Sequence, residues 1–153
     1  MTTMNKKLII ILGPTAVGKT DYSIEMALKY ESPIISCDSR QIYKEMTIGT
    51  AVPSAEQLAA VQHYFIHSHT VTELYTAGKY ELEALDLINR LFDEGHETLV
   101  MAGGSGFYVD ALVNGLDDFP SADQELRNEL MARLKEDGVE SLRAQLKKLD
   151  PES

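Results

Sequence analysis

The chain has 153 residues, of which 44% are hydrophobic and 25% are charged, and its formal net charge is −10. This composition is typical of one globular domain, and it excludes a disordered chain and a generic nucleic-acid binder, which needs many basic side chains. The apolar run from Leu8 to Leu12 is too short to span a membrane or to form a signal peptide, and a single cysteine suits a reducing compartment, so we expect a cytoplasmic protein.

The first sixty residues alternate between strand and helix patterns. Apolar runs predict buried strands at Lys7–Leu12 and Pro33–Ser36, and a breaker-free segment with helical spacing predicts a helix over Lys19–Tyr30. Ser54 and Gln57 have the spacing of a capping box, which predicts that a helix begins there.

The alternation continues through the middle of the chain. Tyr64–Ile66 is a possible short strand, and Lys79–Glu94 has the apolar spacing of an amphipathic helix. A buried strand is expected at Thr98–Ala102 and a helix at Ser105–Val113. Strands without a polar face that alternate with helices predict an α/β fold with a parallel sheet flanked by helices.

The pattern changes after Pro120, where no further strand is indicated. Ser121 to Gln124 has a second capping-box spacing, and a charged helix with a break near Gly138 is expected to reach about Leu149. We therefore expect an α/β core over residues 1–116 and the start of a helical lobe over residues 117–153. Three or four strands make a small sheet, so we expect the front portion of a longer protein.

One loop has the pattern of a phosphate-binding P-loop. It follows the first strand and precedes the first helix, as the G-x-x-x-x-G-K-[ST] motif requires. Its backbone N–H groups, one lysine and one hydroxyl can hold a phosphate and Mg²⁺, and by itself it indicates a nucleotide such as ATP. The loop residues are Gly13, Pro14, Thr15, Ala16, Val17, Gly18, Lys19 and Thr20.

Two further strand ends carry candidate site residues. Asp38 follows the second strand, where it could ligate Mg²⁺ or act as a general base, or could simply stabilise a turn. The later strand ends in Ala102-Gly103-Gly104-Ser105, where Ser105 could contact a substrate or cap a helix. This strand has no terminal aspartate of the kind that NTPases often use for Mg²⁺, so a standard NTPase is disfavoured.

Three histidines, His63, His67 and His69, fall within seven residues. No cysteine or acidic ligand accompanies them, and a helix-to-strand change separates them, so we interpret them as surface or hydrogen-bonding residues rather than a metal site.

Four blocks of sequence together resemble one family. They are GPTAVGKT, ISCDSRQIYKEMTIGTA, VMAGGSGFY and FPSADQELR, collinear from about Leu8 to Pro151. They closely resemble the tRNA dimethylallyltransferases, which are isopentenyltransferases that modify adenosine. The resemblance implies a P-loop NTPase-like fold that binds dimethylallyl diphosphate in place of a nucleoside triphosphate. It also implies transfer of the dimethylallyl group to N6 of the adenosine adjacent to the anticodon of tRNA.

The resemblance assigns roles to individual residues. Residues 13–20 would bind the diphosphate, with Lys19 and Thr20 in catalytic positions, and Thr20 would hold Mg²⁺. Asp38 would be the general base for the N6 amine. The predicted contacts with the tRNA anticodon stem-loop are Asp38, Ser39, Arg40, Gln41, Ser105 and Arg127. We expect a monomer.

The chain departs from the family at Val52, where lysine is usual, at His67, where an acidic residue is usual, and at Ser105, where threonine is usual. The C-terminal half of the family is absent, so this chain is expected to be inactive by itself. Two alternatives remain open: a small-molecule or nucleotide kinase, and a non-catalytic nucleotide-binding module. A kinase needs arginines to clamp phosphates, and only Arg40 and Arg90 lie between the P-loop and Arg127.

Overall fold

The computed structural model describes residues 5–116 and 123–151. The chain divides into two compact units, Met1–Leu116 and Asp117–Ser153. Among the described residues, no helix is both long and apolar enough to cross a bilayer.

The first unit contains a four-stranded, fully parallel sheet with the strand order β1-β4-β2-β3. The predicted α/β fold with a parallel sheet is confirmed. Because parallel neighbours need crossover connections, a helix separates each strand from the next along the chain. The strands are β1 (Lys7–Leu12), β2 (Ile34–Ser36), β3 (His63–Tyr64) and β4 (Thr98–Gly103).

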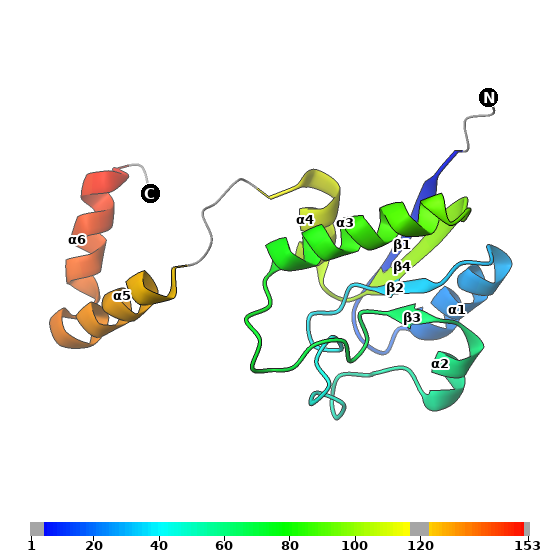
Figure 1. The fold of residues 1–153 in the computed structure, drawn as a ribbon. Helices are drawn as coiled ribbons and strands as arrows, with labels where there is room; N and C mark the ends of the chain where they lie inside the picture. The colour runs from blue at the N-terminus through cyan, green and yellow to red at the C-terminus, as the bar shows by residue number, and fades with distance from the viewer. Residues whose placement is uncertain (1–4, 117–122, 152–153) are drawn as a thin grey trace. The chain divides into compact units, whose positions relative to one another are not determined.

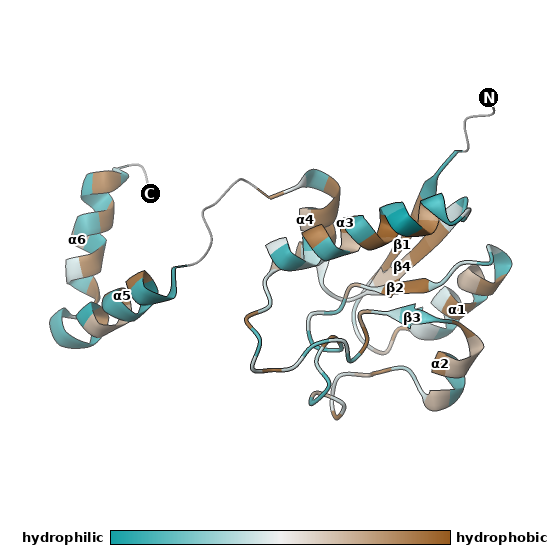
Figure 2. Ribbon diagram, viewed as in Figure 1, coloured by the Kyte–Doolittle hydropathy of each residue, from teal (hydrophilic) through white to brown (hydrophobic). Residues whose placement is uncertain are grey.

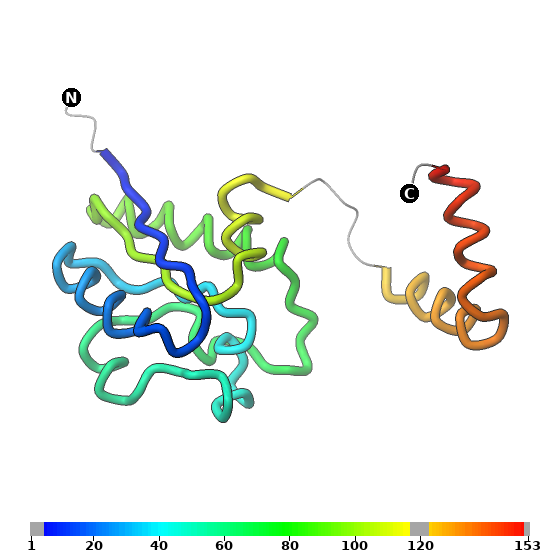
Figure 3. The backbone as a smooth tube through the Cα atoms, turned by 180° about the vertical axis from the view of Figure 1, so that it is seen from behind, coloured from blue at the N-terminus to red at the C-terminus, as the bar shows by residue number. Residues whose placement is uncertain are grey.

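Helices cover both faces of this sheet (Figure 1), and the view from behind shows the same layers (Figure 3). One face carries α3 (Ala77–Asp93) and α4 (Gly106–Asn114), and the other carries α1 (Lys19–Lys29) and α2 (Ala55–Ala60). Figure 2 shows apolar strands between helices whose outer surfaces are mostly polar. This distribution follows from the two-sided burial that the apolar strands require.

Tyr80 on α3 lies in the core between the sheet and the helices α3 and α4 (Figure 1). Its side chain is fully buried and stacks on the ring of Tyr108 from α4, with the ring centroids 4.4 Å apart. Its hydroxyl donates a hydrogen bond to the backbone oxygen of Ser36 at 3.0 Å. This bond satisfies the buried polar atom and fixes α3 against the last residue of β2.

The structure corrects several sequence-based boundaries. β1 was expected to be buried, but it forms an edge of the sheet, and its residues Leu8 to Ile11 are only half-buried. β3 covers His63–Tyr64 and begins one residue earlier than predicted. α3 begins at Ala77 because Thr76, whose side chain accepts a hydrogen bond from the Lys79 N–H, caps it.

The predicted capping box at α2 is confirmed. The Ser54 hydroxyl accepts a hydrogen bond from the Gln57 N–H at 3.2 Å, and the Gln57 side chain accepts one from the Ser54 N–H at 2.9 Å. These reciprocal bonds satisfy two backbone donors that a helix start otherwise leaves unpaired.

The second unit consists of α5 (Gln124–Asp137) and α6 (Val139–Leu149), which are separated at Gly138 as the sequence indicated. Ser121, the first residue of the predicted capping box, lies outside the described residues. The observed N-cap is Asp123, whose carboxylate accepts hydrogen bonds from the N–H groups of Glu125 and Leu126.

Candidate active site

The P-loop connects β1 directly to α1. Ala16 and Gly18 both adopt positive φ angles, of 67° and 85°, so the backbone turns sharply between the end of β1 and the start of α1. Gly18 is the N-cap of α1, and no side chain caps this helix. The start of the helix therefore presents free N–H groups and a partial positive charge at the loop, which favours an anion.

Lys19 adds a positive charge to this loop. Its Nζ donates a hydrogen bond to the backbone oxygen of Pro14, so the side chain folds back across the loop. An ammonium group in this position can exchange the carbonyl oxygen for a phosphate oxygen, which carries more negative charge.

Asp38 follows β2 by two residues and stabilises a turn with one of its two carboxylate oxygens. Its Oδ1 accepts hydrogen bonds from the N–H groups of Arg40 at 2.9 Å and Gln41 at 3.2 Å. Its Oδ2 accepts no hydrogen bond from a described residue. Asp38 can therefore stabilise the turn and also act as a general base, since one oxygen orients the carboxylate and the other can take up a proton.

The chain after β2 is hydrogen-bonded to the chain after β4. The N–H of Cys37 donates to Ala102 O, the N–H of Ser105 donates to Cys37 O, and the Ser105 Oγ accepts from the Ser39 N–H at 2.8 Å. Ser105 is the N-cap residue of α4, but its hydroxyl makes no capping bond. It stabilises the Asp38 turn instead.

Gly103 makes this contact between strand ends possible. A Cβ atom at Gly103 would lie 2.4 Å from the backbone oxygen of Cys37, whereas a Cβ at Gly104 would lie no closer than 3.7 Å to any neighbour, the nearest being Asp38 Oδ2. Only glycine therefore fits at position 103, and Gly104 keeps open the space beside the Asp38 carboxylate.

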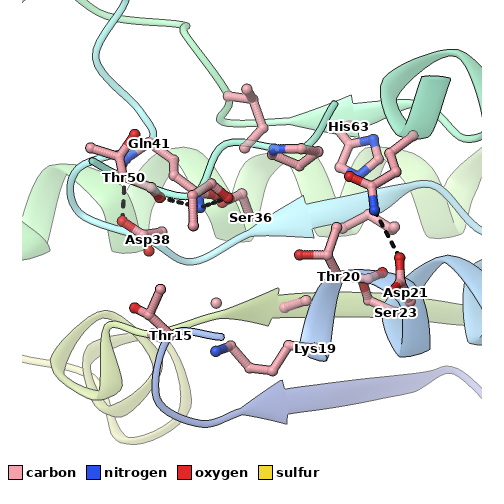
Figure 4. Close-up of a pocket in the computed structure, with 18 of the residues that line it drawn as sticks. Thr15, Lys19, Thr20, Asp21, Ser23, Ser36, Asp38, Gln41, Thr50 and His63 are labelled. Atoms are coloured by element: carbon pink, nitrogen blue, oxygen red, sulfur yellow. Dashed lines mark hydrogen bonds between the residues drawn. The ribbon is translucent and has the colours of Figure 1, made fainter. Parts of the chain in front are cut away.

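The P-loop and the Asp38 turn line a shared pocket at the carboxyl edge of the sheet. Figure 4 shows Thr15 and Lys19 on one side of the pocket and Asp38, Gln41 and Thr50 on the other. The cavity has a volume of about 280 Å³. A second cavity of about 270 Å³, lined by Gly13, Pro14, Ser39, Arg40 and Ser105, shares Thr15, Asp38 and Gly104 with the first. The structure thus brings together the predicted phosphate-binding residues and the predicted general base.

Two predicted residues are not in this group. Val17 lines neither cavity, and its side chain is 60% exposed. Arg127 lies on α5 in the second unit, so its role in binding tRNA stays a prediction.

Two ionisable groups near Asp38, the Cys37 thiol and the Tyr108 hydroxyl, are held neutral. Burial, with the Asp38 charge as a second cause, raises the pKa of the Cys37 thiol to about 12. Burial likewise raises the pKa of Tyr108 to about 12, with smaller effects of Tyr43 and Asp38. Neither group is a nucleophile or base at neutral pH.

The donors in the pocket fit a magnesium ion that is shared with a phosphate ligand. The Thr20 hydroxyl and the Asp38 carboxylate line the same cavity and are hard oxygen ligands. Within residues 5–116 and 123–151, no group of three histidine, cysteine or acidic side chains could hold a metal by itself. A Mg²⁺ ion here would therefore complete its coordination with phosphate oxygens and water.

The three histidines are separated in the structure. His63 lines the pocket, where its Nδ1 donates to the Val61 carbonyl at 2.8 Å, and burial lowers the pKa of its imidazole. His69 is 9% exposed, its Nδ1 is hydrogen-bonded to the Ser68 hydroxyl at 2.8 Å and its Nε2 lies 3.5 Å from a carboxylate oxygen of Glu83, so of the two predicted roles it has the hydrogen-bonding one and not the surface one. The Nε2 of His67 is buried without a hydrogen-bond partner among the described residues.

Sequence reasoning missed several residues of the pocket wall, namely Asp21, Thr50, Gln57 and His63. The Gln57 amide donates a hydrogen bond to the Asp21 carboxylate at 2.8 Å and so joins α2 to the first turn of α1. The capping box revealed the local role of Gln57, but no sequence signal indicated a partner 36 residues away.

A sequence model of the family described as IPP transferase matches residues 41–153. The chain belongs to this family. Among curated members, the tRNA dimethylallyltransferase of Flavobacterium johnsoniae is 51% identical over 147 residues, which are 96% of this chain and 47% of that protein. The tRNA dimethylallyltransferase 2 of Porphyromonas gingivalis is 46% identical over 99% of this chain and 50% of its own length. The chain thus spans about half the length of these relatives.

Solved structures of the IPP transferase family have the same fold. The full-length tRNA isopentenylpyrophosphate transferase of Bacillus halodurans has a TM-score of 0.70 at 36% identity, over 96% of this chain and 48% of that one. A eukaryotic dimethylallyltransferase acting on tRNA has a TM-score of 0.79 at 28% identity, over 95% of this chain and 36% of that one. The family model matches residues 41–153 and so does not include the P-loop. The similarity to the two solved structures extends over 96% and 95% of this chain.

Proposed function

We propose that this chain carries the diphosphate site and the general base of a tRNA prenyltransferase. Its substrate is dimethylallyl diphosphate, and its acceptor is N6 of the adenosine adjacent to the anticodon in tRNA. The observation that carries the proposal is the pocket in which Lys19 and Thr20 face Asp38 (Figure 4). A phosphate-binding loop opposite a carboxylate suits the transfer of a group from a diphosphate to an amine.

In the reaction, the N6 nitrogen forms a bond to C1 of the prenyl chain while the bond from C1 to the diphosphate oxygen breaks. The leaving diphosphate takes the electron pair, and its increasing negative charge is stabilised by the P-loop N–H groups and by Lys19, which releases the Pro14 carbonyl. The N6 proton passes to Asp38 Oδ2, because Oδ1 is engaged by the turn. Mg²⁺ bound at Thr20 would supply further positive charge to the diphosphate.

The first test is ligand binding by this chain. Dimethylallyl diphosphate with Mg²⁺, at a concentration of about 100 times its Kd, stabilises the folded state by roughly 2.7 kcal/mol. This corresponds to a rise in Tm of at least about 5 °C for a chain of this size. We expect Lys19→Met to abolish the rise. Lys29→Met removes a lysine from the other end of the same helix and is expected to leave it unchanged.

Two outcomes of this experiment would contradict the proposal. A rise with ATP and Mg²⁺ but none with the allylic diphosphate would favour a kinase. If Lys19→Met and Lys29→Met showed the same rise in Tm with the allylic diphosphate, the ligand would not be bound by the P-loop.

Transfer is tested in a hybrid enzyme in which this chain replaces the matching part of the Flavobacterium johnsoniae relative, which supplies the length that the chain does not cover. The substrates are dimethylallyl diphosphate and an anticodon stem-loop RNA. We expect prenylated adenosine in the product, and a folded hybrid without transfer would contradict the proposed reaction.

A further inference from the structure

Every N–H hydrogen of Gln41 is donated to a hydrogen bond within the protein. Its side-chain amide has two hydrogens, and Nε2 donates to two successive backbone oxygens, Thr50 O at 2.8 Å and Ala51 O at 2.9 Å. Its backbone N–H donates to Asp38 Oδ1, and its backbone oxygen accepts from the His67 N–H at 2.9 Å.

The two carbonyls that bind the amide mark the point where a loop returns to its start. The loop of residues 42–50 leaves the Asp38 turn and comes back beside Gln41, and the return occurs at Ala51, whose φ is 51°. Inside the loop, the Thr50 hydroxyl donates to Met46 O, and the side chain of Thr50 is almost fully buried. Gln41 thus closes the neck of a compact loop.

The neck forms one wall of the site. Thr50 and Ala51 line the pocket opposite the P-loop, and Figure 4 shows Thr50 and Gln41 together on the side that carries Asp38. Because the N–H of Gln41 also holds the Asp38 carboxylate, one residue fixes both the pocket wall and the orientation of the base.

We infer that Gln41 is a positioning residue whose amide clamps the neck of the 42–50 loop and thereby sets the pocket wall and Asp38 against the P-loop. It acts through these groups, with both hydrogens of its amide engaged within the protein, whereas the family resemblance implies a contact with tRNA. The clamp is a property of the fold, and its effect on transfer rests on the proposed function.

The clamp is tested with Gln41→Glu and Gln41→Ala. Glutamate has nearly the same shape, but it places carboxylate oxygens against the carbonyls of Thr50 and Ala51, so the neck opens. Gln62→Glu is the matched control, because it makes the same change of charge at an exposed side chain that forms no hydrogen bond within the described residues.

The first measurement is trypsin cleavage after Lys44 in the loop, divided by cleavage after Lys29 on α1 to correct for any general loss of stability. The Lys44 N–H donates to His69 O at 2.9 Å, which holds this segment in the closed structure. We expect the ratio to rise roughly tenfold in both Gln41 variants and to stay unchanged in Gln62→Glu. An unchanged ratio in the Gln41 variants would overturn the clamp, whether or not the chain is a prenyltransferase.

The second measurement separates positioning from RNA contact. In the hybrid enzyme, a positioning role predicts that both Gln41 variants lower kcat at least tenfold, while KM for the stem-loop RNA stays within about twofold. A rise in KM with unchanged kcat would assign Gln41 to RNA binding and overturn the inference. Loss of transfer in the unmodified hybrid would contradict the proposed function, and the cleavage ratio would still decide the clamp.

Discussion

The hydroxyl of Ser105, the residue that precedes α4, accepts a hydrogen bond from the backbone N–H of Ser39 at 2.8 Å. The two residues are 66 positions apart, and the bond ties the end of β4 to the turn that carries Asp38. The Ser105 side chain therefore stabilises the turn that carries the proposed base, and it does not cap the helix that it precedes.

Ser105→Ala should weaken the Asp38 turn. One lost hydrogen bond of this kind costs about 1 kcal/mol of stability, so we expect a fall in Tm of a few degrees and a larger, roughly tenfold, loss of transfer in the hybrid enzyme. Ser105→Thr keeps the hydroxyl and should restore both values. An alanine variant with full transfer would show that the bond to Ser39 has no role in catalysis.

Asp38→Asn separates the two roles of the aspartate. The amide oxygen can still accept the hydrogen bonds from Arg40 and Gln41, but the side chain can no longer take up a proton. We expect transfer to fall by about 10² to 10⁴, while the rise in Tm with dimethylallyl diphosphate is retained. Transfer at the wild-type rate would exclude Asp38 as the base.

Two adjacent glycines provide a matched pair. Gly103→Ala places a Cβ 2.4 Å from the Cys37 oxygen, and overpacking against backbone typically costs about 1–3 kcal/mol. We expect thermal melting to show a fall in Tm of roughly 2–12 °C.

Gly104→Ala meets only ordinary contacts, so its Tm should stay within about 2 °C of the wild type. Its methyl group lies beside Asp38 Oδ2, and transfer should therefore decrease. Equal melting temperatures for the two variants would refute the close approach of Gly103 and Cys37.

His63 should make stability depend on pH. Burial lowers the pKa of its imidazole in the folded state below the ordinary value of 6.5, and the contact with Val61 opposes this shift only in part. As the pH falls below about 6.5, the unfolded chain takes up the proton first and is stabilised. We expect the difference in Tm between pH 7.5 and pH 5.5 to be smaller in His63→Gln than in the wild type, and equal differences would contradict the shift.

The sequence predicted the features that depend on local pattern. Apolar runs located β1 and β4, the glycine and lysine spacing located the P-loop, and the position of Asp38 after a strand placed it at the carboxyl edge of the sheet. These predictions succeed because strand direction and strand ends are fixed by residues that are neighbours in sequence.

The features that depend on distant residues were not predictable. The bond from Gln57 to Asp21, the bonds from Gln41 to the loop neck and the contact of His69 with Glu83 all join segments whose spacing carries no signal. The exposure of β1 was also missed, because an apolar run looks the same at the edge and at the centre of a parallel sheet.

The edge position of β1 also bears on the handling of this chain. Within the described residues, β1 pairs only with β4, so its other side presents backbone donors and acceptors along an apolar stretch from Leu8 to Ile11. Such an edge is a template for strand addition between molecules. We therefore expect β1 to be the site at which copies of this chain associate in concentrated solution.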